Sequence, residues 1–440
     1  MALAIGIIIA GSWAGQAQAQ TVDCYQALPG CLDSSFGVNG RVTTPADMKI
    51  AALAIQNITV GNVVEQRIVA VGTVSTTVRR KTVRTWKIAR YLPNGQPDIS
   101  FGSGGSVQTT FPYGNGLAHA VIVQPDNKLL VAGEGYLLKS FASAPMGVPV
   151  VARYQANGAL DASFGSGGMV GVPYGKHAGA TYRLALQTDG KIVATNCYIY
   201  TCRMGVFRLS ANGKLDTSFN SGGTVPGIYV HEAVPSNGNG IGIQTVAGEE
   251  RIVVAGHMLD VNSRNTGTVW RFTSGGLPDT SFGGSGWITT DFFGYASYYY
   301  AMAVDASDRV LAVGYAEGND GRLVMARYQV NGDLDSGFGI GGTVLPAPRL
   351  TSDGAWAVAI QSDQRILLGG ESYQRLGQSS TSYTANWRFD ATGWPDYSFG
   401  TGGWVTTDSK LGDYGFSPLV LQTDGKFVTA GGTALARYYQ

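Results

Sequence analysis

The chain has 440 residues, of which 63 are glycine and 16 are proline, and its 31 basic and 30 acidic side chains leave a formal net charge of +1. This balance excludes the strongly basic surface that is typical of nucleic-acid binding or of attachment to an anionic membrane. Length alone would suggest about two or three domains, but a repeated pattern along the chain overrides that expectation.

The N-terminus has the pattern of an export signal. Residues 2–10 form an apolar run that is too short to span a bilayer, and Ala17-Gln18-Ala19 supplies the small residues of a cleavage site. No Lys or Arg precedes the apolar run, which is atypical of such a signal. We expect a signal peptide over residues 1–19 and a short segment over 20–31. The mature chain would then be secreted or periplasmic, with no integral membrane segment.

Four cysteines fit an oxidising compartment. Cys24 and Cys31 are seven positions apart, and Cys197 and Cys202 are five apart. Each pair can close a short disulfide, whereas neither has the two-residue spacer that is typical of a zinc site. The spacing therefore favours two local disulfides over a metal site.

From residue 32 to 440 the chain repeats a motif of the form Leu-Asp-x-Ser-Phe-Gly-x-Gly-Gly. Successive copies of its phenylalanine are 55 to 65 residues apart, at Phe36, Phe101, Phe164, Phe219, Phe282, Phe338 and Phe399. An aspartate always stands three residues earlier, at Asp33, Asp98, Asp161, Asp216, Asp279, Asp335 and Asp396. A motif at a long, nearly constant period indicates structural units that bury their faces on one another. We therefore expect residues 32–440 to form one domain of seven repeats.

The third repeat shows the expected strands most clearly. Two apolar runs, 182–187 and 191–194, flank the turn Thr188-Asp189-Gly190. A third run, 206–209, leads through the turn Asn212-Gly213 into the next motif. Such turns between short alternating runs are typical of β-hairpins. The repeat therefore predicts four short antiparallel strands and no helix.

Seven such units predict an all-β fold, a seven-bladed β-propeller with four antiparallel strands in each blade. A parallel β-helix would have a shorter period and no repeated Asn-Gly hairpins. The first run of each repeat is rich in small residues, as at Ala52, Gly240 and Ala357, which suits a strand crowded against the propeller axis. The chain starts with an outermost run, Gly40 to Thr44, and ends with a third strand around Ala436 to Tyr438. We expect the N-terminal strand to join the last blade and close the ring.

The combined pattern resembles a known family of exported bacterial proteins. The pattern is carried by Gln187 to Val193, Ala152-Arg153-Tyr154, Asn157-Gly158 and Leu160 to Gly168, and it is similar to the delta-60 repeat over residues 32–440. Single repeats depart from it, as where Asn220 replaces the glycine after the motif phenylalanine. The resemblance implies an exported, propeller-like repeat protein. It implies no reaction, cofactor or catalytic residue.

The repeated charged residues are interpreted as scaffold. Each repeat carries an arginine in its third strand, and six of these arginines precede a motif aspartate by eight residues, as Arg90 precedes Asp98. That spacing across a turn permits an arginine–carboxylate bond within each blade, whereas a sevenfold catalytic site is implausible. Calcium is a weaker interpretation of these turns, because each offers a single motif carboxylate.

Function is instead expected in the segments that differ between repeats, the connections from each outermost strand to the next innermost one. All of them emerge on one face of a propeller. The candidate ligand-binding residues there are His119, His177, His231, Asp291, Tyr295, Trp356 and Asp413. Converging imidazoles and carboxylates could hold a metal or transfer protons. The spacing between the histidines follows the repeat, however, so a polar, aromatic ligand-binding face is favoured, with no catalytic residue, metal or cofactor.

Three hypotheses of function follow. The favoured one is an exported, monomeric, non-enzymatic module that binds a glycan or a protein through the loop face. The alternative is an extracytoplasmic hydrolase or lyase with a histidine and carboxylate site at the central channel. A third is a purely structural envelope protein. The sequence contains no nucleophile elbow, zinc-protease helix, phosphate loop or dinucleotide-binding fingerprint.

Overall fold

A computed structural model describes residues 28–44, 48–78, 80–139, 145–174, 179–198, 202–318, 320–348, 350–376, 379–407 and 417–440. Over these residues the chain forms strands and turns but no helix. Consequently no helix in the described part is long and apolar enough to cross a membrane. The expected signal peptide and Cys24 lie outside the described residues.

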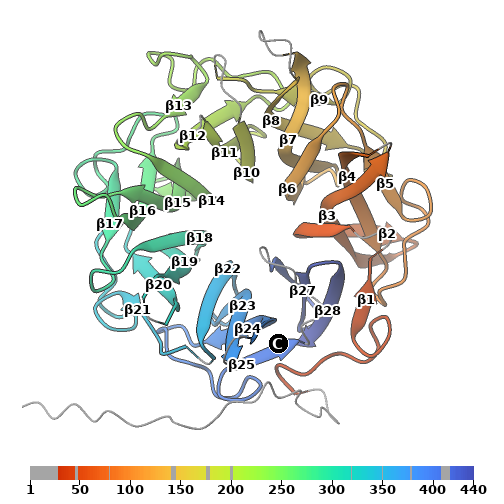
Figure 1. The fold of residues 1–440 in the computed structure, drawn as a ribbon. Helices are drawn as coiled ribbons and strands as arrows, with labels where there is room; N and C mark the ends of the chain where they lie inside the picture. Colours follow the sequence, from red (N-terminus) through yellow and green to blue (C-terminus); the bar gives the residue numbers. More distant parts are fainter. Residues whose placement is uncertain are drawn as a thin grey trace, which may run out of the picture.

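The strands form seven four-stranded antiparallel sheets arranged around an axis, as Figure 1 shows. Blade 1 contains β2 (Lys49–Val60), β3 (Val63–Val78), β4 (Lys81–Tyr91) and β5 (Ser106–Thr109), and blade 2 contains β6 (Gly116–Val123), β7 (Leu129–Lys139), β8 (Pro145–Tyr154) and β9 (Met169–Gly171). Blade 3 contains β10 (Gly179–Leu186), β11 (Ile192–Tyr198), β12 (Arg203–Leu209) and β13 (Ile228–Val230), and blade 4 contains β14 (Ser236–Val246), β15 (Glu249–Leu259), β16 (Asn265–Phe272) and β17 (Trp287–Thr290).

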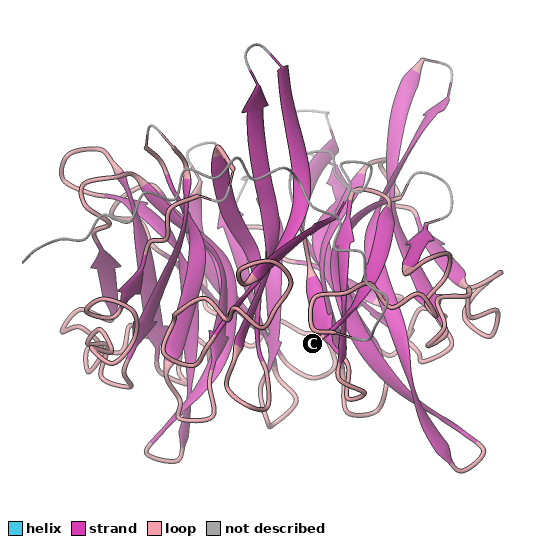
Figure 2. Ribbon diagram, turned by 90° about the horizontal axis from the view of Figure 1, so that it is seen from below, coloured by secondary structure: helices cyan, strands magenta, loops and turns pink. Residues whose placement is uncertain are grey.

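The remaining blades repeat this order, with one exception at the chain ends. Blade 5 contains β18 (Ser297–Val304), β19 (Val310–Ala316), β20 (Arg322–Tyr328) and β21 (Thr343–Val344), and blade 6 contains β22 (Ser352–Ile360), β23 (Ile366–Leu376), β24 (Ser379–Phe389) and β25 (Trp404–Thr407). Blade 7 combines β26 (Leu419–Leu421), β27 (Lys426–Gly431) and β28 (Ala434–Tyr439) with the N-terminal β1 (Arg41–Thr43). Seen from the side, hairpins extend beyond the blades on both faces (Figure 2). The predicted seven-bladed propeller is confirmed.

The ring closes as predicted, because β1 pairs antiparallel with β28. The register places Arg41 opposite Ala436 and Thr43 opposite Ala434, and the two strands lie side by side in Figure 1. The pairing gives β28 a hydrogen-bonding neighbour on each side, so the outer edge of blade 7 is covered in the same way as in the other blades.

The apolar core lies between neighbouring blades. In β3, Val69 and Val71 pack with residues of blade 2, whereas the alternate residues Ile68 and Ala70 pack with residues of blade 7. Side chains alternate between the two faces of a strand, so a strand between two other blades must be apolar on both. This explains why the second run of each repeat consists of consecutive apolar residues.

Six motif arginines donate to a carbonyl oxygen of the following blade, which goes beyond the predicted bond within a blade. Arg153 Nε donates to Asp161 Oδ2 at 2.8 Å, and its Nη1 donates to the carbonyl oxygen of Ala211 in the following blade at 2.6 Å. The guanidinium also lies 4.7 Å from the centroid of the Phe164 ring. All seven motif phenylalanines are fully buried, so this turn is a structural joint, as the sequence indicated.

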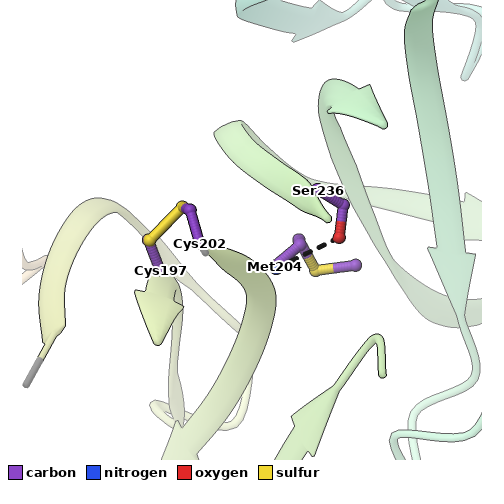
Figure 3. Close-up of a disulfide and its surroundings, with 4 residues drawn as sticks. All are labelled: Cys197, Cys202, Met204 and Ser236. Carbon is purple, nitrogen blue, oxygen red and sulfur yellow. Dashed lines mark hydrogen bonds between the residues drawn. A yellow bond between two sulfur atoms is a disulfide. The ribbon is translucent and has the colours of Figure 1, made fainter. Parts of the chain in front are cut away.

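The predicted Cys197–Cys202 disulfide is present (Figure 3). It joins the ends of β11 and β12 on the side from which the chain enters blade 4. There Ser236, the first residue of β14, donates its amide to the Cys202 carbonyl at 3.0 Å, and its Oγ accepts from the Met204 amide at 3.2 Å. The predicted Cys24–Cys31 disulfide cannot be placed, because Cys24 lies outside the described residues.

Candidate functional site at the propeller axis

The innermost strands of all seven blades surround an axial cavity of about 210 Å³. Small residues line much of it, among them Ala52, Ala120, Gly240 and Ala357. This confirms the prediction that the first, small-residue run of each repeat is the innermost strand. Among the described lining residues the only charged side chain is that of Arg183.

Six innermost strands contain a β-bulge at the same position. The pairing between the first and second strands skips one residue in each of β2, β6, β10, β14, β18 and β22. The skipped residues are Ala51, His119, Tyr182, Asn239, Tyr300 and Trp356, and we call them the bulge ring. A β-bulge redirects a side chain out of the regular alternation. The fold thus offers six variable positions around one axis on an otherwise repeated scaffold.

A glycine in the second strand makes room for the bulge in five of these blades. At Gly133, a Cβ atom would lie only 1.9 Å from the carbonyl oxygen of Leu117, a distance that no side chain tolerates. The glycines at the same place in the other four blades are Gly72, Gly256, Gly314 and Gly370. These repeated glycines were a signal in the sequence from which the bulges could have been predicted.

Members of the bulge ring contact one another across blade boundaries. The Tyr300 and Trp356 ring centroids are 4.1 Å apart, and those of His119 and Tyr182 are 5.7 Å apart. Asn239 Nδ2 donates to the carbonyl oxygen of Tyr299 at 2.8 Å. These side chains are held by rigid strands and by each other, so their geometry is set before a ligand arrives.

On the side of blades 2 and 3, the ring carries His119 and Tyr182 next to Arg183. Burial and the positive charge of Arg183 lower the pKa of His119 to about 4, so its imidazole is neutral at neutral pH. Burial raises the pKa of the Tyr182 phenol and lowers the pKa of Arg183 to about 10. Arg183 therefore still carries its positive charge at neutral pH.

On the side of blades 4 to 6, aromatic side chains form a continuous strip. It consists of His257, Tyr298, Tyr300 and Trp356, and we call it the aromatic strip. Tyr298 and Tyr300 are stacked with centroids 6.2 Å apart, and His257 packs edge-on to Tyr298 at 4.8 Å. The Tyr298 hydroxyl donates to Glu317 at 2.8 Å and accepts from Asn265 at 3.1 Å. Each of the four rings is only partly buried, so their remaining surface is open to a ligand.

The structure brings together two of the seven residues that the sequence predicted as ligand-binding. His119 and Trp356 both belong to the bulge ring, although they lie within β6 and β22 rather than in the preceding connections. The sequence reasoning missed Tyr182, Asn239 and Tyr300, because it did not interpret the repeated second-strand glycines as the sign of a bulge. Arg183 was also missed, since a single arginine inside an apolar run has no motif.

The other predicted residues lie elsewhere or outside the described part. His231 follows β13 and is 4% exposed, with its ring 6.0 Å from Trp270 and 5.3 Å from Trp287. Asp291 accepts from Arg264 at 3.1 Å in an exposed turn. Tyr295 is 38% exposed just before β18. His177 and Asp413 are outside the described residues.

No group of three or more histidine, cysteine, aspartate or glutamate side chains that could hold a metal occurs in the described ranges. The described residues at the axis instead provide aromatic rings, hydrogen-bonding groups and the positive charge of Arg183, and the carboxylate of Glu317 is bonded to Tyr298 beside them. Both His119 and Tyr182 have pKa values displaced away from neutrality. Efficient proton transfer requires pKa values near the working pH, and the pKa values of these two side chains are shifted away from it.

Four segments of the chain match a β-propeller family of unknown function. The segments are residues 67–101, 124–164, 251–282 and 306–338, and the family is described as "Domain of unknown function (DUF5122) beta-propeller". They lie in blades 1, 2, 4 and 5 and cover less than half of the chain. No curated protein matches the sequence.

Solved structures resemble this chain at low sequence identity. An ulvan lyase of polysaccharide lyase family PL25 is 10% identical, with 91% of this chain and 95% of that chain covered and a TM-score of 0.46. Drosophila semaphorin 1b is 8% identical, with 91% and 86% covered and a TM-score of 0.43. A Penicillium chrysogenum α-L-arabinanase is 11% identical, with 80% and 98% covered and a TM-score of 0.42. These likenesses concern the fold alone.

Proposed function

We propose that the protein is an exported, non-enzymatic binding module that holds an acidic glycan at the mouth of its axial cavity. The observation that carries the proposal is the bulge ring. It places His119, Tyr182 and Tyr300 directly before residues that line the axial cavity, and Trp356 in its wall, and the one described charge of that cavity is positive. Export is supported by the signal-like N-terminal sequence and by the Cys197–Cys202 disulfide, since disulfides persist in oxidising compartments.

The aromatic strip supplies a stacking surface for a sugar ring. An aromatic ring has a negative face, which attracts the weakly positive C–H groups on one side of a pyranose. Tyr300 and Trp356 come from neighbouring blades and meet beside the axial cavity, where Trp356 is part of the wall.

Arg183 supplies the preference for an acidic sugar. A guanidinium matches a carboxylate in shape and can donate two parallel hydrogen bonds to it. The cavity wall around Arg183 is mostly apolar, and screening by water is weaker in such surroundings than at an open surface. A carboxylate or sulfate group on the glycan would therefore be bound more strongly there than on an exposed lysine.

The alternative function is a lyase, and the ring contact between His119 and Tyr182 beside Arg183 is the observation that favours it. A guanidinium can neutralise a uronate carboxylate while a neighbouring base removes the adjacent proton. Two facts disfavour this function. The pKa of His119 is too low for an effective base at neutral pH, and the pKa of Tyr182 is raised rather than lowered.

The experiment compares binding of polygalacturonate and of a neutral mannan to the parent protein and to three variants, by calorimetry at low salt. Tyr300→Ala and Arg183→Met should each weaken polygalacturonate binding about tenfold or more, which is about 1.4 kcal/mol. Arg183→Met should also remove most of the salt dependence. Leu277→Ala, which removes an exposed apolar side chain from a turn of blade 4, is the matched control and should bind as the parent does.

Binding that is equal in all four proteins would contradict the proposal. Release of unsaturated oligosaccharides by the parent, and their loss in Arg183→Met, would instead establish the lyase. Ultraviolet absorbance of the unsaturated product distinguishes the two functions in the same samples.

A further inference from the structure

A second cavity lies on the outer rim of the propeller, away from the axis. It has a volume of about 580 Å³ and lies between β21 of blade 5 and the turn before β25 of blade 6. Ile340, Pro346 and Pro348 form part of one wall, and Trp394 and Tyr397 part of the other. We call it the rim groove. No charged side chain occurs among the described residues that line it.

The repeats themselves show that the rim groove departs from the scaffold. In the other blades the residues at the position of Trp394 are Cys31, Gln96, Ala159, Lys214, Leu277 and Asp333. Those at the position of Tyr397 are Ser34, Ile99, Ala162, Thr217, Thr280 and Ser336. Only the turn of blade 6 carries an aromatic residue at either position, and it carries one at both. The scaffold therefore does not require these rings.

The two rings are exposed, and the turn that carries Trp394 is held by hydrogen bonds of its backbone. Trp394 is 54% exposed and Tyr397 is 63% exposed, and Ile340 on the facing wall is 75% exposed. The turn that carries Trp394 is fixed by its backbone amide, which donates to Asp390 Oδ1 at 3.0 Å, and by its carbonyl, which accepts from the Asp390 amide at 2.8 Å. Exposing so much aromatic surface in one place is unfavourable unless something binds it, and a rigid turn lowers the entropic cost of binding.

We propose that the rim groove is a second binding site, for a short stretch of an uncharged oligosaccharide. The absence of charge in its described walls matches a neutral ligand. Trp394 and Tyr397 offer flat faces for sugar rings, and the hydroxyl groups of Tyr397 and Thr401 can bond with sugar hydroxyls. The groove volume falls in the range of small-ligand sites, about 300 to 1,000 Å³.

A protein partner is less well matched to the rim groove. A stable protein interface buries about 800 Å² on each partner, whereas the departures from the repeat are confined to the one cavity. The neighbouring turn of blade 5 presents the charged Asp333 at the position of Trp394, so the aromatic surface does not continue along the rim.

The test uses the full-length mature protein and measures Trp fluorescence and heat on titration with cellohexaose, mannohexaose and a proline-rich decapeptide. At least one hexasaccharide should bind the parent, and binding should fall at least about tenfold in Trp394→Ala and in Tyr397→Ala. Leu277→Ala, at the position of Trp394 in blade 4, is the matched control and should bind as the parent does.

The proposal is overturned if neither hexasaccharide binds, or if binding survives in both rim variants. Binding of the decapeptide alone, with loss in Trp394→Ala, would assign the groove to a peptide instead. The rim variants leave the axial residues intact, and the axial site is judged by its binding of polygalacturonate, so either site can fail without affecting the other. The three positions substituted in this test are exposed, and circular dichroism will confirm that each variant is folded.

Discussion

Arg437 Nη2 lies 2.6 Å from Asp33 Oδ2, although one residue is in the last strand of the chain and the other precedes the first. Lys426 Nζ lies 3.0 Å from the same oxygen. Burial opposes ionisation of Asp33, but Ser35, Lys426 and Arg437 outweigh it and hold its pKa well below the usual range. This ion pair is the blade 7 copy of the bond between a motif arginine and a motif aspartate, and it joins the two ends of the chain.

Asp33→Asn should therefore weaken ring closure. The substitution leaves the buried Arg437 without its counter-charge, and breaking a buried pair from one side costs about 3 to 5 kcal/mol. Asp363→Asn removes a carboxylate from an exposed pair with Arg365 and should cost less than about 1 kcal/mol. Chemical unfolding measures both. Equal stability losses in the two variants would contradict the role given to Asp33.

Removing residues 28–44 should have a stronger effect, because it deletes β1 and exposes the edge of β28. We expect aggregation or the loss of cooperative unfolding, which light scattering and calorimetry detect. A truncated protein that stays monomeric and melts like the parent would show that blade 7 is stable with three strands.

Arg153→Lys tests the joint between blades. A lysine ammonium cannot reach Asp161, Ser163 and the Ala211 carbonyl at once, as the guanidinium does. We expect a loss of about 2 to 3 kcal/mol in the free energy of unfolding. Arg365→Lys, whose parent side chain is 44% exposed, is the control and should change stability by less than about 1 kcal/mol. A similar small change in both variants would mean that the motif arginines contribute charge but no specific geometry.

Acid should destabilise the protein in part through His257. Burial lowers the pKa of His257 from its ordinary value near 6.5 to about 4. As the pH falls from 6.5 towards 4, the unfolded chain binds a proton at this site that the folded chain does not, so stability falls over that window. The loss at pH 5 is about 2 kcal/mol for this residue.

His257→Gln should remove that part of the pH dependence. The difference in melting temperature between the parent and the variant should become smaller as the pH is lowered from 7 to 5. Between pH 7.5 and 8.5 neither protein should change through this site, because the histidine is neutral in both states. An unchanged acid slope in the variant would show that His257 is protonated normally in the folded protein.

The Cys197–Cys202 disulfide should contribute modestly to stability. The bond closes a loop of five residues, for which the chain-entropy relation gives about 2 kcal/mol. Replacing both cysteines with serine should lower the free energy of unfolding by about that amount, with the largest local effect where Ser236 bonds to Cys202 and Met204. Hydrogen exchange at the start of β14 measures the local effect. Titration of the oxidised, denatured parent should find no free thiol.

The sequence by itself determined the fold, because every repeat contains the same turns and apolar runs. The phenylalanine and aspartate of every motif must be buried and paired in the same way in each blade, so seven copies constrain one another. Ring closure followed from counting strands, since Gly40 to Thr44 had no partner within its own repeat. The Cys197–Cys202 disulfide could also be predicted from the sequence, because the two cysteines are close together in the chain.

Only the tertiary structure decided which variable residues meet. His119, Tyr182, Tyr300 and Trp356 are far apart in the chain and gather because a bulge turns each of them at the same height of a different innermost strand. The rim groove likewise joins Ile340 of one repeat to Trp394 of the next. The pattern of apolar and turn residues within a repeat determines where its strands form. The contact between two blades also depends on strand register and on the angle at which the sheets pack. The sequence of a single repeat determines neither of these.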